Sequence, residues 1–195
     1  MAQDPSAGED ASVSHWETVS IEPHADARVF RVVRKHCRHP QRDVTTDFFV
    51  IDSVDWVNVI ALTTDGQLVL VNQYRIGRER ISLELPGGMM EPGEDPVAAG
   101  LRELQEETGF HGGTARLLAT VDPNPAVQNN VCHFVFVDGV TRTGTLAWDE
   151  HEEIEVVTHP VDEVFAIAQA GGIKHSLTLN ALFFFAPEWR RRGRV

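Results

Sequence analysis

Three glutamates at helical spacing are the residues of this sequence best suited to chemistry: Glu103, Glu106 and Glu107. They lie three and four positions apart, so a helix would place all three side chains on one face. Each pair of like charges destabilises a helix by about 0.3 kcal/mol, and the helix dipole disfavours anions near the C-terminal end. We therefore expect a bound cation, and carboxylate oxygens suit a hard ion, Mg²⁺ or alternatively Mn²⁺. The competing interpretation is an exposed helix whose charged face is simply solvated.

The elements around these glutamates define a helix and a preceding loop. We expect a helix over 95–108, because Glu94 or Asp95 can cap it, Pro96 suits a first turn and Gly109 can end it. The glycines at 87–88 bring bare backbone close to that helix. A backbone carbonyl from this loop could therefore complete a metal site.

The net charge of the chain is concentrated in two segments. The 195 residues carry a net charge of −12, of which residues 84–107 contribute −6 and residues 148–163 contribute −7. No broad basic face remains for a nucleic-acid backbone, so no nucleic-acid partner is expected.

No apolar run reaches the roughly 18 residues of a membrane span, and the first residues do not resemble a secretion signal. We expect a cytoplasmic protein without membrane contact, with Cys37 and Cys132 reduced.

The order of expected elements predicts one mixed domain with an N-terminal addition. Residues 1–13 are expected to be disordered, residues 14–53 to form an antiparallel β appendage, residues 54–187 the main domain, and residues 188–195 a basic tail. Strands are expected at 16–21, 27–33, 44–51, 57–62, 67–73, 82–85, 115–121, 131–139 and 154–158, and further helices at 161–170 and 177–185. Thr64-Asp65-Gly66 is a hairpin signal, because such a turn needs positive φ. The pattern is typical of an α/β or α+β fold.

The glutamates belong to a longer motif, Gly88-x5-Glu94-x7-Arg102-Glu103-Leu104-x-Glu106-Glu107-x-Gly109-Phe110. This motif resembles the Nudix box at all seven fixed positions and at both bulky apolar positions. The resemblance implies an α/β/α sandwich around a mixed sheet, with a loop–helix–loop platform for metal. It implies that Glu103 and Glu107 are the principal ligands, that Glu106 is a further or water-mediated ligand, and that the carbonyl of Gly87 completes the coordination. Box residues Gly88, Glu94 and Arg102 would hold the platform together.

Four features outside the box resemble the branch of ADP-ribose pyrophosphatases and nucleotide-sugar hydrolases. The first is the N-terminal three-stranded appendage, which in that branch builds a domain-swapped homodimer. The second is the segment 71–75, Val-Asn-Gln-Tyr-Arg, whose arginine in that branch reaches a substrate phosphate. Arg75 is therefore expected to bind substrate, although a charged residue on an edge strand is the alternative.

The third feature is an acidic segment at 149–154, which resembles the mobile acidic loop of that branch. In the family one glutamate of this loop acts as base and another binds metal. By position Glu150 is the expected base and Glu152 the expected ligand, with Glu153 an alternative for either role. Glu106 also remains a candidate catalytic residue. A flexible, solvated acidic loop is the competing interpretation.

The fourth feature is the stiff segment 123–126, Pro-Asn-Pro-Ala, followed by asparagines at 129 and 130. Asn124 and Asn130 are expected to contact a sugar hydroxyl, although turn formation explains Asn and Pro equally well. Trp56 is a candidate for stacking on the base, as are Trp16, Phe30 and Phe48.

The function expected from the resemblance is metal-dependent hydrolysis of the pyrophosphate bond of ADP-ribose or a related nucleoside diphosphate sugar. The products would be a nucleoside monophosphate and a sugar phosphate. The alternatives are a Nudix hydrolase of another nucleotide, such as coenzyme A, a dinucleoside polyphosphate or capped RNA, and a nucleotide-sugar-binding module without hydrolysis.

Overall fold

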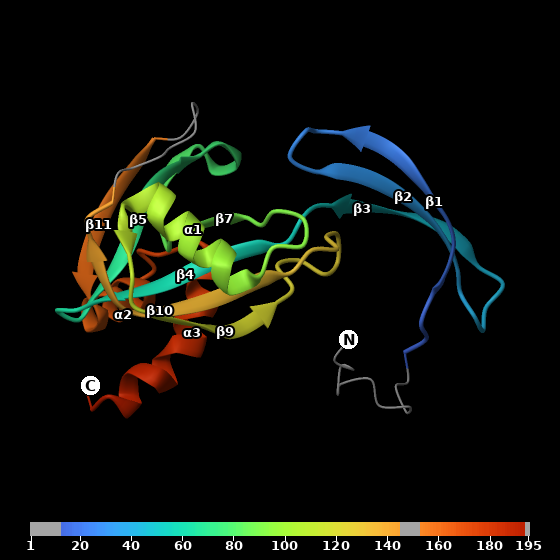
Figure 1. Ribbon diagram of the computed structural model, residues 1–195. Coiled ribbons are helices and arrows are strands. Elements are labelled where there is room, and N and C mark those ends of the chain that lie inside the picture. The colour runs from blue at the N-terminus through green and yellow to red at the C-terminus, as the bar shows by residue number, and fades with distance from the viewer. Residues whose placement is uncertain (1–12, 145–152, 194–195) are drawn as a thin grey trace. The chain divides into compact units, whose positions relative to one another are not determined.

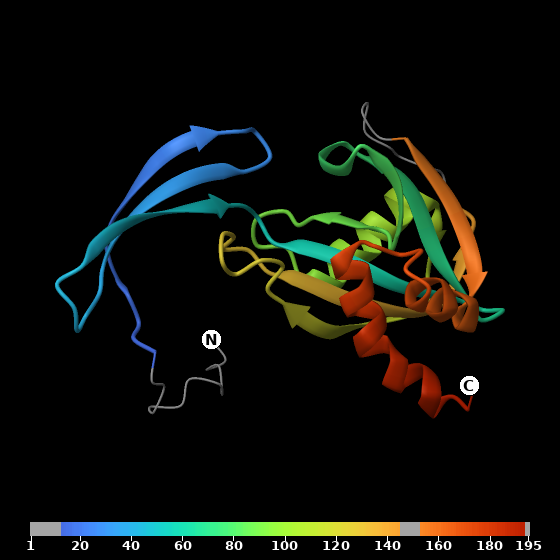
Figure 2. The same ribbon diagram turned by 180° about the vertical axis from the view of Figure 1, so that it is seen from behind.

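The computed structural model describes residues 13–144 and 153–193, which form two compact units. The first unit contains the described residues up to Ser53 together with Asn124–Asn129. The second contains Val54–Pro123 and the described residues from Asn130 onward. Figures 1 and 2 show the elements from opposite sides.

The first unit is an antiparallel three-stranded sheet. Its strands are β1 (Glu17–Asp26), β2 (Arg31–Arg38) and β3 (Thr45–Asp52), paired in the order β1-β2-β3. The prediction of a strand at 27–33 is wrong in its first half, because the chain turns before β2 begins. Arg28 has a φ of 65°, and its N–H donates to the carboxylate of Asp26 at 2.9 Å. An aspartate side chain that accepts a hydrogen bond from the backbone N–H two residues later stabilises a turn and not a continuing strand.

The second unit is built on a mixed sheet, as the sequence predicted. Its strands are β4 (Trp56–Thr63), β5 (Gln67–Arg75), β6 (Arg80–Glu84), β7 (Gly87–Met89), β8 (Phe110–His111), β9 (Thr114–Val121), β10 (Cys132–Arg142) and β11 (Ile154–Pro160). The central order is β11-β5-β4-β10-β8, with β6 paired to β5, β7 to β4 and β9 to β10. Strands β4 and β10 run parallel and the other pairs are antiparallel.

Helices cover both faces of this sheet. Helix α1 (Pro96–Thr108) lies on one face, and α2 (Val161–Gln169) and α3 (Ser176–Arg191) lie on the other, as Figures 1 and 2 show. The alternation of side chains along β4 supplies both cores. Val59 packs in the cluster with Leu104 of α1, whereas Ile60 packs in the cluster with Phe185 of α3, and all four are fully buried. A strand buried on both faces explains the unbroken apolar run of its sequence.

Two local features position the elements of this unit. The β4–β5 hairpin closes at the expected Asp-Gly turn, where Gly66 has a φ of 82° and its N–H donates to the carbonyl of Thr63 at 3.0 Å. Helix α3 runs to Arg191, well beyond the expected end near residue 185. Trp189, buried and bonded through Nε1 to Asp162 at 2.7 Å, extends the apolar face of α3 past Pro187. No helix of the described residues has the length and hydropathy needed to cross a membrane.

Candidate active site

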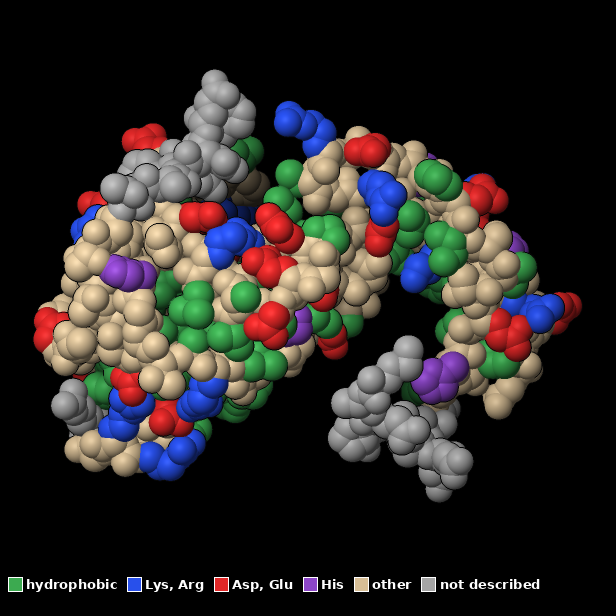
Figure 3. Space-filling model, in the orientation of Figure 1, with side chains coloured by type: hydrophobic (Ala, Val, Ile, Leu, Met, Phe, Trp, Pro, Cys, Tyr) green, Lys and Arg blue, Asp and Glu red, His purple; other side chains and the backbone are tan. Residues whose placement is uncertain are grey.

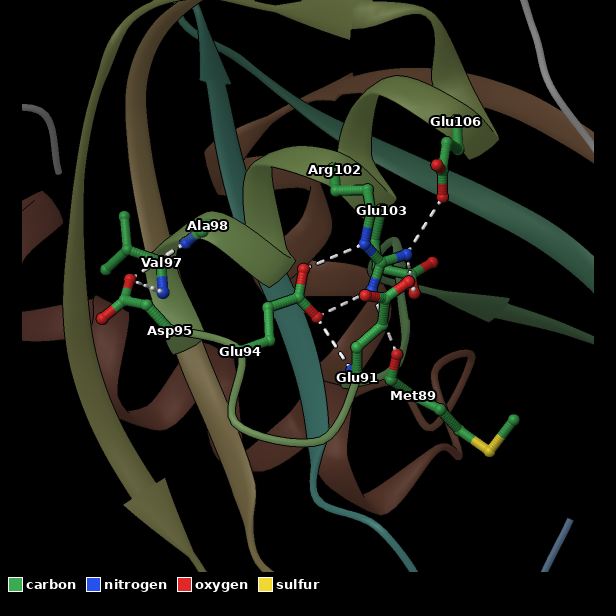
Figure 4. Close-up of polar contacts among 9 residues, drawn as sticks. All are labelled: Met89, Glu91, Glu94, Asp95, Val97, Ala98, Arg102, Glu103 and Glu106. Carbon is green, nitrogen blue, oxygen red and sulfur yellow. Dashed lines mark hydrogen bonds and ion pairs between the residues drawn. The ribbon is translucent and has the colours of Figure 1, made fainter.

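Helix α1 begins and ends at the residues that the sequence singled out. The carboxylate of Asp95 accepts hydrogen bonds from the N–H groups of Val97 and Ala98, at 3.0 and 3.1 Å (Figure 4). Gly109 ends the helix with a φ of 70°, in the left-handed region that glycine adopts at low cost. The helix is thereby fixed at both ends, with its glutamates in the last two turns.

Arg102 is the centre of an ionic network on this helix, drawn in Figure 4. Its Nε and Nη2 donate to the two carboxylate oxygens of Glu94 at 3.0 and 3.1 Å. Its Nη1 donates to Glu103 at 2.8 Å and to Glu106 at 3.1 Å, and Nη2 also reaches the carbonyl of Met89 at 3.2 Å. The pKa of Arg102 is raised, first by the hydrogen bond that it donates to Glu94, and the pKa of Glu94 is lowered by the same bond. The guanidinium therefore ties the 89–94 loop to the helix and offsets repulsion between the glutamates.

Glu107 is held in a buried position by two hydrogen bonds. Its side chain is only 4% exposed. Gln73 Nε2 on β5 donates to Glu107 Oε1 at 3.0 Å, and the N–H of Gly87 donates to Glu107 Oε2 at 2.9 Å. A buried carboxylate requires such donors, since an unsatisfied one is costly. Both oxygens of Glu107 are thus oriented by groups from the sheet.

The two glycines of the 87–88 loop are required by close approach. A Cβ on Gly88 would lie 2.6 Å from the carboxylate of Glu103, and one on Gly87 would lie 2.1 Å from the carbonyl oxygen of Val57. Gly87 also has a φ of 158°, a conformation that residues with a side chain rarely adopt, so both the backbone and the close contact require glycine. The backbone of β7 therefore passes directly beside the carboxylates of α1.

These carboxylates line a cavity of about 760 Å³ in the second unit. Its walls include Glu103, Glu106 and Glu107 of α1, Gly87 and Gly88 of β7, Arg75 and Arg102, and Glu153. In Figure 3, acidic side chains gather over α1 around a basic one. We refer to this space as the acidic cavity.

The donor chemistry of the acidic cavity suits a divalent cation, although its ligands are not assembled around a point. Glutamate oxygens and a nearby backbone carbonyl are the donors that hard cations take. Among the described residues, no group of three or more His, Cys, Asp or Glu side chains is arranged to hold a metal ion. Instead, Glu103 pairs with Arg102, and Glu107 pairs with Gln73 and the Gly87 N–H. Glu106 is the most accessible of the three, with 43% of its side chain exposed.

Arg75 forms the wall between the acidic cavity and a second one. Its Nε and Nη2 donate to the two oxygens of Glu84 at 3.0 and 2.8 Å, while 48% of its side chain remains exposed. Glu84 is fully buried, and burial opposes its ionisation, but Arg75 and His175 together lower its pKa. Burial in turn lowers the pKa of His175, so this histidine is neutral near neutral pH and Arg75 compensates the charge of Glu84.

The second cavity has a volume of about 600 Å³ and shares Arg75 and the 87–89 backbone with the first. Trp56, a candidate for base stacking, lines it and is partly buried. Its walls also carry Arg78, Arg80 and Lys174, so we refer to it as the basic cavity. The structure thus brings Arg75 and Trp56 to one connected region with the box glutamates.

Neither of the two expected asparagines is among the described residues that line these cavities. Asn124 belongs to the first unit, where its carbonyl accepts from Val127 and Gln128 in a turn, at 3.0 and 2.9 Å. Asn130 is 3% exposed, and neither polar atom of its side chain has a hydrogen-bond partner among the described residues. A side chain so deeply buried is closed to a substrate, and the structure gives no support to a binding role for Asn130.

The expected base and ligand of the acidic loop, Glu150 and Glu152, lie outside the described residues. Glu153, the alternative for either role, lines the acidic cavity just before β11. Sequence reasoning missed Gln73 and Glu84 as parts of the site. Gln73 lies two positions from Arg75 on β5, so alternation already placed both on one face.

Comparison with known proteins identifies the family. The model of the NUDIX domain matches residues 54–179. An ADP-sugar pyrophosphatase of Mus musculus is 34% identical over 176 residues, covering 87% of this chain and 77% of that protein. A methanol dehydrogenase activator of Bacillus methanolicus is 32% identical over 127 residues, covering 65% and 69%.

A solved structure supports the fold. A crystal structure of an ADP compounds hydrolase superposes with a TM-score of 0.82 over 95% of this chain and all of that one, at 21% identity. The box geometry, the mixed sheet between helices and the family match lead to one conclusion. The chain belongs to the Nudix family of hydrolases.

Proposed function

We propose that this protein hydrolyses the pyrophosphate bond of ADP-ribose or a related nucleoside diphosphate sugar, releasing a nucleoside monophosphate and a sugar phosphate. The observation that carries the proposal is the acidic cavity, which is lined by both Arg75 and the glutamates Glu103, Glu106 and Glu107. A pyrophosphate needs both kinds of group, cation-binding carboxylates and a cationic partner for its oxygens. Similarity to the murine ADP-sugar pyrophosphatase and to an ADP-ribose pyrophosphatase of Bacillus subtilis, 27% identical over 127 residues, supports the substrate class.

We propose Mg²⁺ as the cofactor, with Mn²⁺ as an alternative. Glu103 and Glu107 would hold it, with the carbonyl of Gly87 and Glu152 as further ligands and Glu106 as a direct or water-mediated one. A bound divalent ion would neutralise the phosphate oxygens and lower the pKa of an attacking water. The fit rests on the oxygen donors and on the bare Cα of Gly88, which leaves room for the Glu103 carboxylate.

The protein's own groups have separable tasks in this proposal. Arg102 and Glu94 hold the glutamates in place, while Gln73 orients Glu107. Arg75, whose side chain is 48% exposed, would bind a phosphate oxygen, and Trp56 would contact the base or sugar. A carboxylate at 150, 152 or 153, or Glu106, would take the proton of the attacking water. Glu153 is supported by its place on the wall of the acidic cavity.

We propose that the protein is a homodimer formed through the appendage 14–53. A small sheet gains stability by burying an apolar face, and the strands of this one expose large apolar side chains. They include Val19 and Ile21 at 57% each, Phe48 at 44% and Phe49 at 49%. Figure 3 shows apolar side chains over β1–β3. Sedimentation equilibrium should give twice the 21.7 kDa chain mass for the wild type and the chain mass for Ile21→Asp. The chain mass for the wild type would refute the dimer.

A cytoplasmic location stays a prediction.

A substrate panel tests the proposed activity. Purified protein is incubated with ADP-ribose, ADP-glucose, UDP-glucose, coenzyme A and diadenosine tetraphosphate, with Mg²⁺ or with EDTA. The proposal expects AMP and ribose 5-phosphate from ADP-ribose with Mg²⁺ only, faster than any product from the last two compounds. Release of no nucleoside monophosphate from any nucleoside diphosphate sugar would refute it.

A further inference from the structure

The basic cavity carries a positive charge that the ion pairs of the fold do not account for. Among the described residues, its lining includes Arg75, Arg78, Arg80 and Lys174, with Glu84 as the one carboxylate. Glu84 is engaged on both oxygens by Arg75. The positive charges of Arg78, Arg80 and Lys174 are therefore not compensated by Glu84, although the net charge of the whole chain is −12.

No partner among the described residues explains the position of these three cations. Within the ranges 13–144 and 153–193, no ion pair or side-chain hydrogen bond involves Arg78, Arg80 or Lys174. They come from separate parts of the chain: Arg78 from η1 (Ile76–Arg78), Arg80 from β6, and Lys174 from the turn before α3. Most other arginines of the described chain do pair, as Arg34 does with Glu22 and Arg192 with Asp138. Like charges gathered on one cavity repel one another, and an anion in the cavity would relieve that repulsion.

The basic cavity and the acidic cavity are neighbours that share lining residues. Both are lined by Arg75, Gly87, Gly88 and Met89. A substrate whose pyrophosphate lies between the box glutamates and Arg75 can therefore extend directly into the basic cavity. The pyrophosphate itself needs only Arg75 and the bound cation, which leaves Arg78, Arg80 and Lys174 for another anionic group.

We propose that the basic cavity binds an anionic group, a carboxylate or a phosphate monoester, carried by the sugar moiety of the substrate. The proposal rests on the proposed function for the position of the pyrophosphate. It adds a preference within the proposed substrate class: nucleoside diphosphate sugars whose sugar carries a further negative charge should be favoured over those with an uncharged sugar. Lys174 and Arg80 are the specificity residues, since neither takes part in the box network.

A pair of substrates that differ by one charge tests this inference. ADP-glucose and ADP-glucuronate share base, ribose, pyrophosphate and ring, and differ by a carboxylate at C6. Wild-type kcat/KM should favour ADP-glucuronate at least about fivefold, and added salt should reduce that preference. Lys174→Gln should bring the ratio close to one, and Lys174→Arg should retain it. Arg190→Gln is the matched control: it removes one exposed α3 cation that lines neither cavity and should leave the ratio unchanged.

Binding measured without turnover separates this inference from the proposed function. Calorimetric titration in EDTA gives the ratio of the two dissociation constants for wild type and Lys174→Gln. The inference is supported if the wild type binds ADP-glucuronate more tightly than ADP-glucose and Lys174→Gln abolishes that difference. This holds even if neither compound is hydrolysed, because absence of hydrolysis would refute only the proposed activity. Equal wild-type affinity for the two compounds, or a preference that Lys174→Gln and Arg80→Gln both leave intact, overturns the inference even if both are hydrolysed.

Discussion

Gln73 Nε2 on β5 lies 3.0 Å from Glu107 Oε1 on α1, and this bond joins two residues 34 positions apart across the candidate active site. The other oxygen of Glu107 accepts from the Gly87 N–H. The carboxylate is therefore oriented from the sheet side, independently of the Arg102 network. Gln73 is a positioning residue in this account, because it acts on Glu107 and not on substrate.

Replacing Gln73 by leucine should lower kcat about tenfold and raise the Mg²⁺ concentration needed for half-maximal rate, because Glu107 loses an orienting donor. Asn72→Leu is the matched control. It removes the hydrogen bond from the neighbouring position to Glu155, at 2.8 Å, on the opposite side of β5. Steady-state kinetics across a Mg²⁺ titration measure both effects. An identical metal dependence in the two variants would mean that Gln73 is merely structural.

Gly88→Ala should abolish most of the activity while the fold persists. The new Cβ would lie 2.6 Å from the Glu103 carboxylate, so that side chain must leave its position beside β7. We expect kcat to fall at least about a hundredfold with a circular dichroism spectrum like that of the wild type. Gly77→Ala is the control, since nothing lies within 4 Å of a Cβ at that position. Activity within a factor of three of wild type would show that Glu103 need not occupy this place.

Arg102→Ala should destabilise the protein by about 1–3 kcal/mol, because charge-assisted bonds to Glu94, Glu103 and Glu106 are lost together. Arg102→Lys should recover part of that loss, since it keeps the charge but not the fork that binds both Glu94 oxygens. Urea denaturation gives the three free energies of unfolding. Equal stability of the wild type and Arg102→Ala would contradict the role assigned to this network.

The Glu84–Arg75 pair predicts a pH dependence of stability. The pKa of Glu84 is lowered below its ordinary 4.5, so its contribution is present above that value and is lost as pH falls through the folded-state pKa. The difference in free energy of unfolding between wild type and Glu84→Gln should therefore be constant from pH 7 to 6 and shrink below pH 4.5. Asp122→Asn removes one exposed carboxylate without an ion pair in the described chain and controls for net charge. If the difference in free energy of unfolding between wild type and Glu84→Gln grew as the pH falls, the pKa of Glu84 would not be lowered by folding, which would contradict this account.

Mg²⁺ should stabilise the folded protein if the box glutamates bind it. At a concentration about 100 times Kd, binding adds about 2.7 kcal/mol, or roughly 5 °C or more in Tm for a chain of this size. Glu103→Gln should lose most of this gain, whereas Glu163→Gln on α2 should keep it, because Glu163 pairs with His159 outside the acidic cavity. Differential scanning calorimetry with and without Mg²⁺ measures the shift. The same gain in both variants would place the ion elsewhere.

The sequence predicted those parts of the fold that depend on local chemistry. Asp95 and Gly109 carry their own signals for the ends of α1, and Asp65-Gly66 carries the signal for its hairpin. The relation of the box glutamates to one another follows from helical spacing alone, and the pairing of Arg102 with Glu94 and Glu106 agrees with the scaffold role expected for it. The family resemblance then supplied the mixed sheet between helices.

Contacts between residues distant in the sequence were beyond such reasoning. Nothing near Gln73 indicates that its amide meets Glu107, and nothing near Glu84 indicates burial against Arg75 and His175. The end of α3 was missed because burial of Trp189 and its bond to Asp162 depend on the fold of α2. The burial of Asn130 was likewise beyond such reasoning, since its residue type suits a ligand contact and gives no sign that the side chain is buried.

The most direct test of the account is the product analysis of ADP-ribose cleavage by the wild type and by Glu107→Gln. Chromatography after incubation with Mg²⁺ should show AMP and ribose 5-phosphate in equal amounts from the wild type. Glu107→Gln should form them at least about a hundredfold more slowly, with an unchanged circular dichroism spectrum. A near-normal rate for Glu107→Gln, or wild-type cleavage that persists in EDTA, would contradict a metal-dependent reaction at the box glutamates.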